Sequence, residues 1–375
     1  MYIIQYMYKN STGSLPDIAI KRLITEGVIL NARFDDVKPA SLDLRVDLKT
    51  IVEVPSVFLP SKNRFSIPEI LDQFQAKNIY TEGATCIEPG KTYVAEVVES
   101  VDFSKDPEIF ARVNPKSSSG RVDIHVQLLA NYTPAYDTVF KGYTGKLYVL
   151  LRSKSFKIIF NDDIVSLNQM MFFKGKRNLV SENDLEDVIE TGILRNNKKD
   201  ISLKPQDVIK GKEKIELSLD LKDLGSICGY VAKENVQKPL IWKKAENNKE
   251  DFFEPIENIS ADEGYIFKKD RFYILSSREA IHIPRDYACE MISFDDTLGE
   301  FRSHYAGFID NGWGENGHRP LTLELRCNED IYMYHGQPIA YMVLDHMTEP
   351  VEKSYDQIDS NYLDQLTARL GKFFK

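Results

Sequence analysis

Short apolar or β-branched runs, separated by turn residues, dominate the pattern of hydrophobic and polar positions along this chain. Runs of this length between Gly, Pro, Asp and Asn are typical of strands in a β-barrel or β-roll. The pattern therefore predicts a mainly β chain, with strands at residues 93–98, 124–129, 147–151, 156–160, 272–275, 321–325 and 339–344.

Two segments have the spacing of short helices instead. In the first, Pro16 precedes apolar residues at 18, 20, 23 and 24, which share a helical face, and Gly27 ends the pattern. In the second, Ser181 and Asp184 form a start that resembles a capping box, followed by apolar residues at 185, 188 and 189. We expect a few short helices in a chain that is otherwise β.

The two β-rich stretches are separated by a charged segment, residues 176–212, which contains the second predicted helix. A chain of 375 residues is long enough for two domains that each bury a core. We expect an N-terminal β domain at 1–175 with an extension at 1–14, a linker at 176–212, a C-terminal β domain at 213–350, and a tail at 351–375.

The composition excludes several classes of protein. A net charge of −9 disfavours a nucleic-acid-binding surface, which needs clustered cations, but it does not exclude a free nucleotide. No apolar run reaches membrane-spanning length. The cysteines at 86, 228, 289 and 327 lack the spacing of a disulfide framework or zinc knuckle, so we expect a reduced, cytoplasmic location.

One turn-rich segment, residues 114–121, brings hydroxyls and cations together between two predicted strands. A loop of this composition has three uses: it can clamp a phosphate, it can orient a water molecule, or it can be a solvated turn. Other catalytic signatures are missing from the chain. It has no His-x-Glu with Pro-Cys-x-x-Cys for a zinc deaminase, no Gly-x-Ser-x-Gly elbow and no Walker phosphate loop. We interpret His304 and His318 as surface or strand residues.

Several motifs occur in an informative order. The chain contains Pro-Ala-Ser-Leu-Asp-Leu-Arg at 39–45, Glu-Ser-Val at 99–101, Ser-Ser-Ser-Gly-Arg at 117–121, and Asp-Asn-Gly-Trp at 310–313, followed by Leu-Thr-Leu-Glu-Leu at 321–325. This order resembles the dCTP deaminase branch of the trimeric dUTPase-like family, whose core motif is Ser-Ser-x-x-Arg. The resemblance extends from about Leu15 to the end of the chain and is strongest to the long, two-domain bacterial members.

The resemblance implies a tandem duplication of a dUTPase-like β-clip domain, a distorted jelly roll. Consistent with a duplication, Arg-Glu-Ala-Ile at 278–281 repeats the element that begins at Glu99. The implied activity is zinc-independent deamination of dCTP to dUTP and ammonia, in the route to dUMP and dTTP. The implied partners are dCTP or dUTP with Mg²⁺ bound through the triphosphate, and the implied assembly is a trimer of two-domain chains.

The same resemblance assigns roles to individual residues. Glu324 is the implied general acid and base, and Ser117 and Arg121 hold the attacking water. The implied substrate-binding residues are Lys116, Ser118, Ala306, Asp310, Trp313, Tyr355, Tyr362 and Gln365. The last three lie in the tail, which we expect to close over the nucleotide as a lid.

Neither half carries a complete set of these residues. Leu150 stands where the first half would carry the glutamate, and Thr297 or Leu298 stands where the second half would carry the arginine. The hydroxyl pair of the second half has become Ser-Phe-Asp-Asp at 293–296. These complementary losses predict a composite site in which Ser117 and Arg121 face Glu324. Whether the two contributions come from one chain or from two remains open from the sequence.

Other functions fit the same residues. A dUTP diphosphatase, or a bifunctional deaminase that forms dUMP, would place an activated water near the α-phosphate, with Asp310 as the nearest carboxylate. The third hypothesis is a catalytically silent nucleotide-binding or scaffold protein. As purely structural residues, Glu324 would be an exposed strand carboxylate, and Arg121 would form a salt bridge with Asp123 or another acid.

Overall fold

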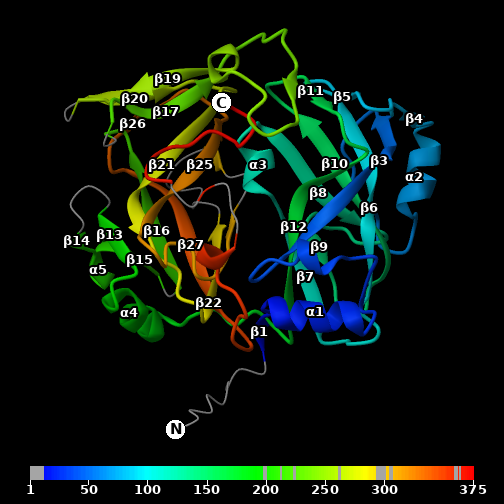
Figure 1. Cartoon of the computed structure of the whole chain (residues 1–375), viewed down its shortest axis with the longest axis horizontal. Helices are drawn as coiled ribbons and strands as arrows, with labels where there is room; N and C mark the ends of the chain where they lie inside the picture. Colours follow the sequence, from blue (N-terminus) through cyan, green and yellow to red (C-terminus); the bar gives the residue numbers. More distant parts are fainter. Residues whose placement is uncertain are drawn as a thin grey trace.

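The computed structural model describes residues 12–196, 201–211, 213–222, 225–260, 263–292, 301–303, 307–358, 362 and 365–375. Two β-rich bodies lie side by side, one formed mainly by the blue to green N-terminal half and the other by the green to orange C-terminal half (Figure 1). This arrangement confirms a mainly β chain with a few short helices. Among the described residues, no helix is long and apolar enough to cross a membrane.

The N-terminal body contains an antiparallel sheet with the strand order β8-β10-β6-β3-β12-β7-β9. Apolar side chains on its inner face form a buried core. The elements of this body are β1 (Gly13–Ser14), α1 (Asp17–Thr25), β2 (Ile29–Leu30), η1 (Phe34–Asp36), β3 (Leu42–Val54), α2 (Ile67–Gln73), β4 (Lys77–Asn78), β5 (Thr85–Ile87), β6 (Thr92–Asp102), β7 (Ile109–Pro115), α3 (Ser117–Gly120), β8 (Ile124–Ala130), β9 (Thr138–Val139), β10 (Thr144–Ser153), β11 (Ile158–Phe160) and β12 (Ile164–Lys174).

The C-terminal body contains a second sheet, with the order β14-β13-β21-β16-β27-β22-β24, and β25 pairs with β21 and β23. Its elements are α4 (Glu182–Glu190), β13 (Leu194–Asn196), β14 (Ile201–Ser202), α5 (Pro205–Val208), β15 (Ile209–Lys210), β16 (Lys214–Asp220), β17 (Ile227–Ala232), β18 (Leu240–Ile241), η2 (Lys249–Asp251), β19 (Phe253–Glu257), β20 (Gly264–Phe267), β21 (Phe272–Ile281), β22 (Tyr287–Ile292), β23 (Phe301–Ser303), β24 (Phe308–Ile309), β25 (Arg319–Cys327), β26 (Ile331–Tyr334), β27 (Pro338–His346) and η4 (Tyr355–Gln357).

Both predicted helices form where the sequence signals place them. Helix α1 buries Ile20 and Leu23, and Gly27 follows it with a φ of 69°, a left-handed conformation that glycine adopts without strain. Helix α4 begins after Ser181, whose hydroxyl accepts a hydrogen bond from the backbone amide of Asp184.

The charged segment 176–212 is not a separate linker, which corrects the expected domain boundary. The apolar face of α4, with Leu185 and Ile189, is buried in the core of the C-terminal body. Strand β13 extends the same sheet, because Leu194 pairs with Ile281 of β21. The physical reason is that an amphipathic helix must cover its apolar stripe, and the neighbouring sheet supplies the cover.

Two segments from the C-terminal half complete the N-terminal core, so the bodies do not correspond to two uninterrupted stretches of sequence. Strand β18 pairs in parallel with β11, and Trp242 and Phe252 are buried in the N-terminal core. The end of the tail joins them there, since the ring centroids of Trp242 and Phe373 are 4.2 Å apart. These contacts tie the two bodies together.

The sheet topology confirms the tandem duplication. Strands β3, β6, β7, β10 and β12 of the first repeat correspond in pairing to β16, β21, β22, β25 and β27 of the second. In the first repeat Glu99 accepts a 2.8 Å hydrogen bond from the backbone amide of Arg45. In the second, Glu279 accepts a 2.8 Å bond from the amide of Ser218. The same buried glutamate thus links the same two strands in each repeat.

This correspondence also aligns the strands that carry the candidate carboxylate. Leu150 on β10 lies opposite Val94, and Glu324 on β25 lies opposite Ile274. Both partners are the fifth residue before the buried glutamate of their own repeat. Leu150 and Glu324 are therefore equivalent positions, as the sequence motifs predict.

Candidate functional site

The Ser-Ser-x-x-Arg segment forms a short helical turn, α3, between β7 and β8. Strand β12 holds the turn in place, because the Leu167 carbonyl accepts hydrogen bonds from the Ser119 hydroxyl at 2.7 Å and from the Lys116 amide at 2.9 Å. The segment ends at Asp123, whose φ of 59° is left-handed, a conformation that Asp tolerates. Helix α3 lies on the side of the N-terminal body that faces the C-terminal body (Figure 1).

Arg121, at the end of this turn, projects across the boundary and is 3% exposed. Its Nε lies 3.7 Å from Oε1 of Glu324. The guanidinium also donates to Oε1 of Gln365 at 2.9 Å and to the Arg369 carbonyl at 2.8 Å, and it lies 4.0 Å from the centroid of the Tyr362 ring. A buried guanidinium needs such partners to offset its lost hydration. The C-terminal tail therefore holds Arg121 against Glu324.

Glu324 comes from the middle of β25 and is 1% exposed. Side chains two residues apart on a strand share a face, so Thr322 points to the same side. The buried Thr322 hydroxyl and the buried indole Nε1 of Trp313 have no hydrogen-bond partner among the described residues. Both residues line the cavity between the two bodies.

Arg121, Trp313 and Thr322 line a cavity of about 250 Å³ between the two bodies. The N-terminal half contributes α3 and the strands next to it, and the C-terminal half contributes β24, β25 and the tail. Glu324 lies beside this cavity, next to Arg121. Nine of the residues predicted from the sequence line the cavity: Lys116, Ser117, Ser118, Arg121, Asp310, Trp313, Tyr355, Tyr362 and Gln365.

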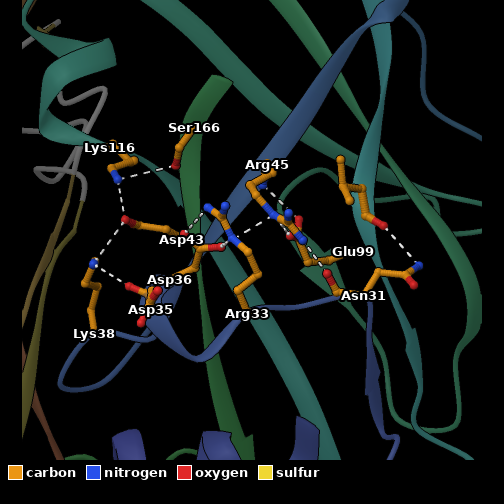
Figure 2. Close-up of polar contacts among 11 residues, drawn as sticks. Asn31, Arg33, Asp35, Asp36, Lys38, Asp43, Arg45, Glu99, Lys116 and Ser166 are labelled. Carbon is orange, nitrogen blue, oxygen red and sulfur yellow. Dashed lines mark hydrogen bonds and ion pairs between the residues drawn. The ribbon is translucent and has the colours of Figure 1, made fainter. Parts of the chain in front are cut away.

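A network of alternating charges forms the N-terminal wall of the cavity (Figure 2). Lys116 forms an ion pair with Asp43 and contacts the Ser166 hydroxyl at 3.3 Å. Lys38 lies 3.7 Å from the same Asp43 carboxylate. The network continues away from the cavity to Arg45, which pairs with Glu99 (Figure 2). Lys116, predicted as a cation for the substrate, thus already has a carboxylate partner.

Asp310 follows β24 and closes another side of the cavity. Its Oδ1 accepts a 3.1 Å hydrogen bond from the backbone amide of Ala40, which joins the two bodies again. Burial raises the pKa of the Asp310 carboxyl to about 7, and the nearby Asp43 charge acts in the same direction. Asp310 is therefore a carboxyl group that titrates near neutral pH inside the cavity.

Comparison with known proteins assigns this architecture. The family models of the 2'-deoxycytidine 5'-triphosphate deaminase (DCD) N-terminal and C-terminal domains match residues 11–176 and 186–374. The chain belongs to the dCTP deaminase family. Its fold is accordingly a duplicated, dUTPase-like β-clip. The C-terminal family domain starts at 186, which agrees with the placement of α4 in the C-terminal body.

Members of the dCTP deaminase family with known structure or curated function resemble this chain to different extents. The crystal structure of 2'-deoxycytidine 5'-triphosphate deaminase from Agrobacterium tumefaciens is 32% identical, with a TM-score of 0.79, over 92% of this chain and 98% of its own. The "dCTP deaminase, dUMP-forming" of Methanosphaera stadtmanae is 27% identical over 143 residues, 36% of this chain and 70% of that protein. The enzyme of the same name from Persephonella marina is 30% identical over 101 residues, 26% of this chain and 53% of that protein.

Within this deaminase fold, one chain brings the two complementary halves together. Arg121 from the first repeat and Glu324 from the second are neighbours without any contribution from another subunit. In the first repeat, Leu150 is fully buried in an apolar cluster that includes Ile67 of α2. Helix α2 therefore covers the face of β10 that carries Leu150. The equivalent face of β25 carries Glu324. Ala306 and residues 293–298 lie outside the described residues.

Other residues considered from the sequence have structural partners. Arg319, the first residue of β25, forms a bidentate ion pair with Asp356. Nε2 of His318 lies 2.7 Å from the Gly192 carbonyl, and His304 lies outside the described residues. In the part of the chain that the structure describes, no group of three or more His, Cys, Asp or Glu side chains could hold a metal ion. Asp43 and Asp310 are carboxylates that line the cavity, and Asp43 already pairs with Lys116 and Lys38.

Sequence reasoning missed several residues of the site. Asp43 belongs to the motif at 39–45, so its proximity to the site could have been expected, but its pairing with Lys116 could not. Thr322 lies two positions before Glu324, and strand periodicity could have placed it on the same face. Lys372 also lines the cavity, although nothing in the local sequence marks it.

Proposed function

We propose that this chain catalyses the hydrolytic deamination of dCTP to dUTP and ammonia in pyrimidine deoxynucleotide metabolism. The observation that carries the proposal is the buried pair of Arg121 and Glu324 beside the cavity. The repeats have lost complementary residues, yet the retained ones meet at one place. A catalytically silent binding protein would have no need to keep this arrangement.

In the proposed reaction, water attacks C4 of the cytosine ring. Glu324 accepts a proton from the water as the C4–O bond forms and delivers it to the ring nitrogen N3. It then takes the second proton from the new C4 hydroxyl and delivers it to the amine. The C4–N bond breaks and ammonia leaves. Arg121 and Ser117 hold the water and stabilise the charge that develops on it. Burial of these groups strengthens their electrostatic effect.

The triphosphate occupies the other end of the cavity in this proposal. Lys116 and Ser118 donate hydrogen bonds to phosphate oxygens, while Trp313 and Asp310 contact the nucleoside. Bound Mg²⁺ would neutralise part of the triphosphate charge and fix its conformation. Tyr355, Tyr362 and Gln365 form the tail side of the site. Zinc independence remains a prediction, to be checked by assay with a strong transition-metal chelator.

A second candidate function is a deaminase that also hydrolyses the triphosphate and releases dUMP. Two relatives carry the name "dCTP deaminase, dUMP-forming". Asp310, whose carboxyl titrates near neutral pH within the cavity, can accept a proton from a water that attacks the α-phosphate. This function differs from the first in its products, not in its site.

One assay distinguishes the candidates. Purified protein is incubated with dCTP and Mg²⁺, and ammonia, dUTP, dUMP and pyrophosphate are quantified separately. Ammonia with dUTP supports the deaminase, and ammonia with dUMP and pyrophosphate supports the bifunctional enzyme. Hydrolysis of dUTP without ammonia release from dCTP would identify a diphosphatase. Binding of dCTP without any product would identify a silent protein.

The assembly remains a prediction. We propose a homo-oligomer, a trimer of two-domain chains, on the basis of the trimeric family pattern. The described residues of the site all come from one chain. The activity of each chain should therefore be independent of its oligomeric state, which sedimentation and activity measured across the same dilution series would check.

A further inference from the structure

Lys372 differs from the other cations of the cavity. Lys38 and Lys116 share Asp43, and Arg121 is held by Glu324 and the tail. Among the described residues, no carboxylate lies within ion-pair distance of Lys372, although the residue lines the cavity. A triphosphate brings about four negative charges near neutral pH, which require local donors in an acidic protein.

The backbone of Lys372 is firmly anchored. Its carbonyl accepts a 3.0 Å hydrogen bond from the amide of Ala245, and the carbonyl of the next residue, Phe373, accepts a 2.9 Å bond from the amide of Asn247. The Phe373 ring is 1% exposed and packs on Trp242. Lys372 therefore lines the cavity from a fixed part of the N-terminal body.

Lys372 lines the same cavity as Lys116 and Asp43, and their charges act on its ammonium group. Burial lowers the pKa of Lys372, and the Lys116 cation is the next largest cause, followed by the opposing effect of Asp43 and the effect of Lys244. Of these groups, Lys116 and Asp43 form the ion pair that is shown in Figure 2. Lys372 thus lines the same cavity as Lys116 and Ser118, which the proposed function assigns to the phosphates. An anion placed between Lys372 and Lys116 would relieve their mutual repulsion.

We propose that Lys372 binds the terminal phosphates of the nucleotide and sets the preference of the site for triphosphates over shorter phosphate chains. This inference rests on the proposed function, because it takes a deoxycytidine nucleotide as the ligand. Lys116 and Ser118 on α3 contact the phosphates from one side, and Lys372 contacts them from the other. Removing the β- and γ-phosphates removes the group that Lys372 recognises.

The test compares phosphate-chain length in matched variants. Lys372→Met keeps the aliphatic length and removes the charge, Lys372→Arg keeps the charge, and Lys375→Met removes an exposed charge from the same tail outside the cavity. Each is combined with Glu324→Gln, so that binding of dCTP, dCDP and dCMP can be measured by calorimetry without turnover. Inorganic tripolyphosphate serves as a competitor that carries the phosphates without the nucleoside.

We expect Lys372→Met to weaken dCTP binding about ten- to a hundredfold, the usual effect of losing a charged hydrogen bond. It should leave dCMP binding within about twofold, and it should weaken competition by tripolyphosphate. Lys372→Arg should retain most of the preference for dCTP over dCMP, and Lys375→Met should match the protein that carries Glu324→Gln alone.

Two outcomes would overturn the inference: unchanged dCTP binding by Lys372→Met, or an equal loss for all three nucleotides, which indicates damage to the fold. Thermal unfolding of each variant shows whether the substitution has destabilised the fold. The inference and the proposed function can fail separately. If the unmodified protein releases no ammonia but binds dCTP through Lys372, only the reaction is wrong. If ammonia is released at an unchanged rate and KM by Lys372→Met, only the role of Lys372 is wrong.

Discussion

Arg326 of the second repeat forms an ion pair with Asp123 of the first, one strand period away from the pair of Glu324 and Arg121. Arg326 also donates to the Ser155 hydroxyl at 3.1 Å. Because residues two apart on β25 share a face, Glu324 and Arg326 both point at the segment that carries Arg121 and Asp123. The two pairs have opposite polarity, so the register between the repeats is specified by charge.

The first prediction concerns the ion pair between Asp123 and Arg326. Asp123→Asn should lower the free energy of unfolding by about 3 to 5 kcal/mol, because it leaves Arg326 partly buried without its charged partner. Asn tolerates the left-handed backbone at this position, so the change does not add strain. The control is Asp330→Asn, which removes an exposed ion pair with Lys268 and should change stability much less. Urea unfolding of both variants checks this, and equal effects would contradict it.

The second prediction concerns the carboxylate. Glu324→Gln should reduce ammonia release from dCTP by about a hundredfold to ten-thousandfold, the range expected for loss of a general acid and base. Nucleotide binding should persist, because the amide keeps nearly the same shape. Glu254→Gln, on the exposed side of β19, is the matched control and should retain full activity. Full activity in Glu324→Gln would show that another group transfers the proton.

The third prediction follows from the placement of both contributions in one chain. Arg121→Ala and Glu324→Gln should each inactivate the protein, and mixing or co-refolding the two variants should restore no activity. Every site in the mixture still carries one lesion, since Arg121 meets Glu324 of its own chain. Mixtures of each variant with unmodified protein serve as the positive control. Recovered activity would mean that the working site joins two chains.

The fourth prediction uses the pKa of Asp310, which burial raises from 3.8 to about 7. Between these values the folded protein keeps a proton that the unfolded chain releases. The contribution of Asp310 to the free energy of unfolding therefore falls as the pH rises from about 4 to about 7, and it is constant above. A shift of this size corresponds to a few kcal/mol, at about 1.4 kcal/mol for each pH unit.

The measurement compares Asp310→Asn with the unmodified protein by urea unfolding between pH 5 and pH 8. The stability of the variant relative to the unmodified protein should rise towards pH 7 and then level off. A constant difference caused by the amide itself would not alter this slope. The exposed Asp330 has a lowered pKa, so Asp330→Asn should show no such trend in this range. Parallel stability curves for Asp310→Asn and the unmodified protein would exclude a raised pKa.

Much of the fold could be read from local sequence patterns. Pro16 and Gly27 mark the limits of α1, and Ser181 marks the start of α4, because capping and glycine conformations depend on only a few neighbouring residues. The domain limits could not be read in this way. The segment 176–212 is charged, like a linker, yet one face of α4 is apolar enough to join the C-terminal core.

By itself, the sequence determined the strands, the duplicated motifs and the complementary losses at Leu150 and in the second repeat, since these depend on residue type and order. Only the tertiary structure decided that Arg121 meets Glu324 within one chain. It also decided that Lys116 is paired with Asp43 and that Lys372 reaches the cavity. Such contacts depend on how two sheets and a distant tail pack against each other, and burial of Phe373 beside Trp242 sets that packing. Non-local apolar contacts of this kind leave no periodic signal near the residues that they bring together.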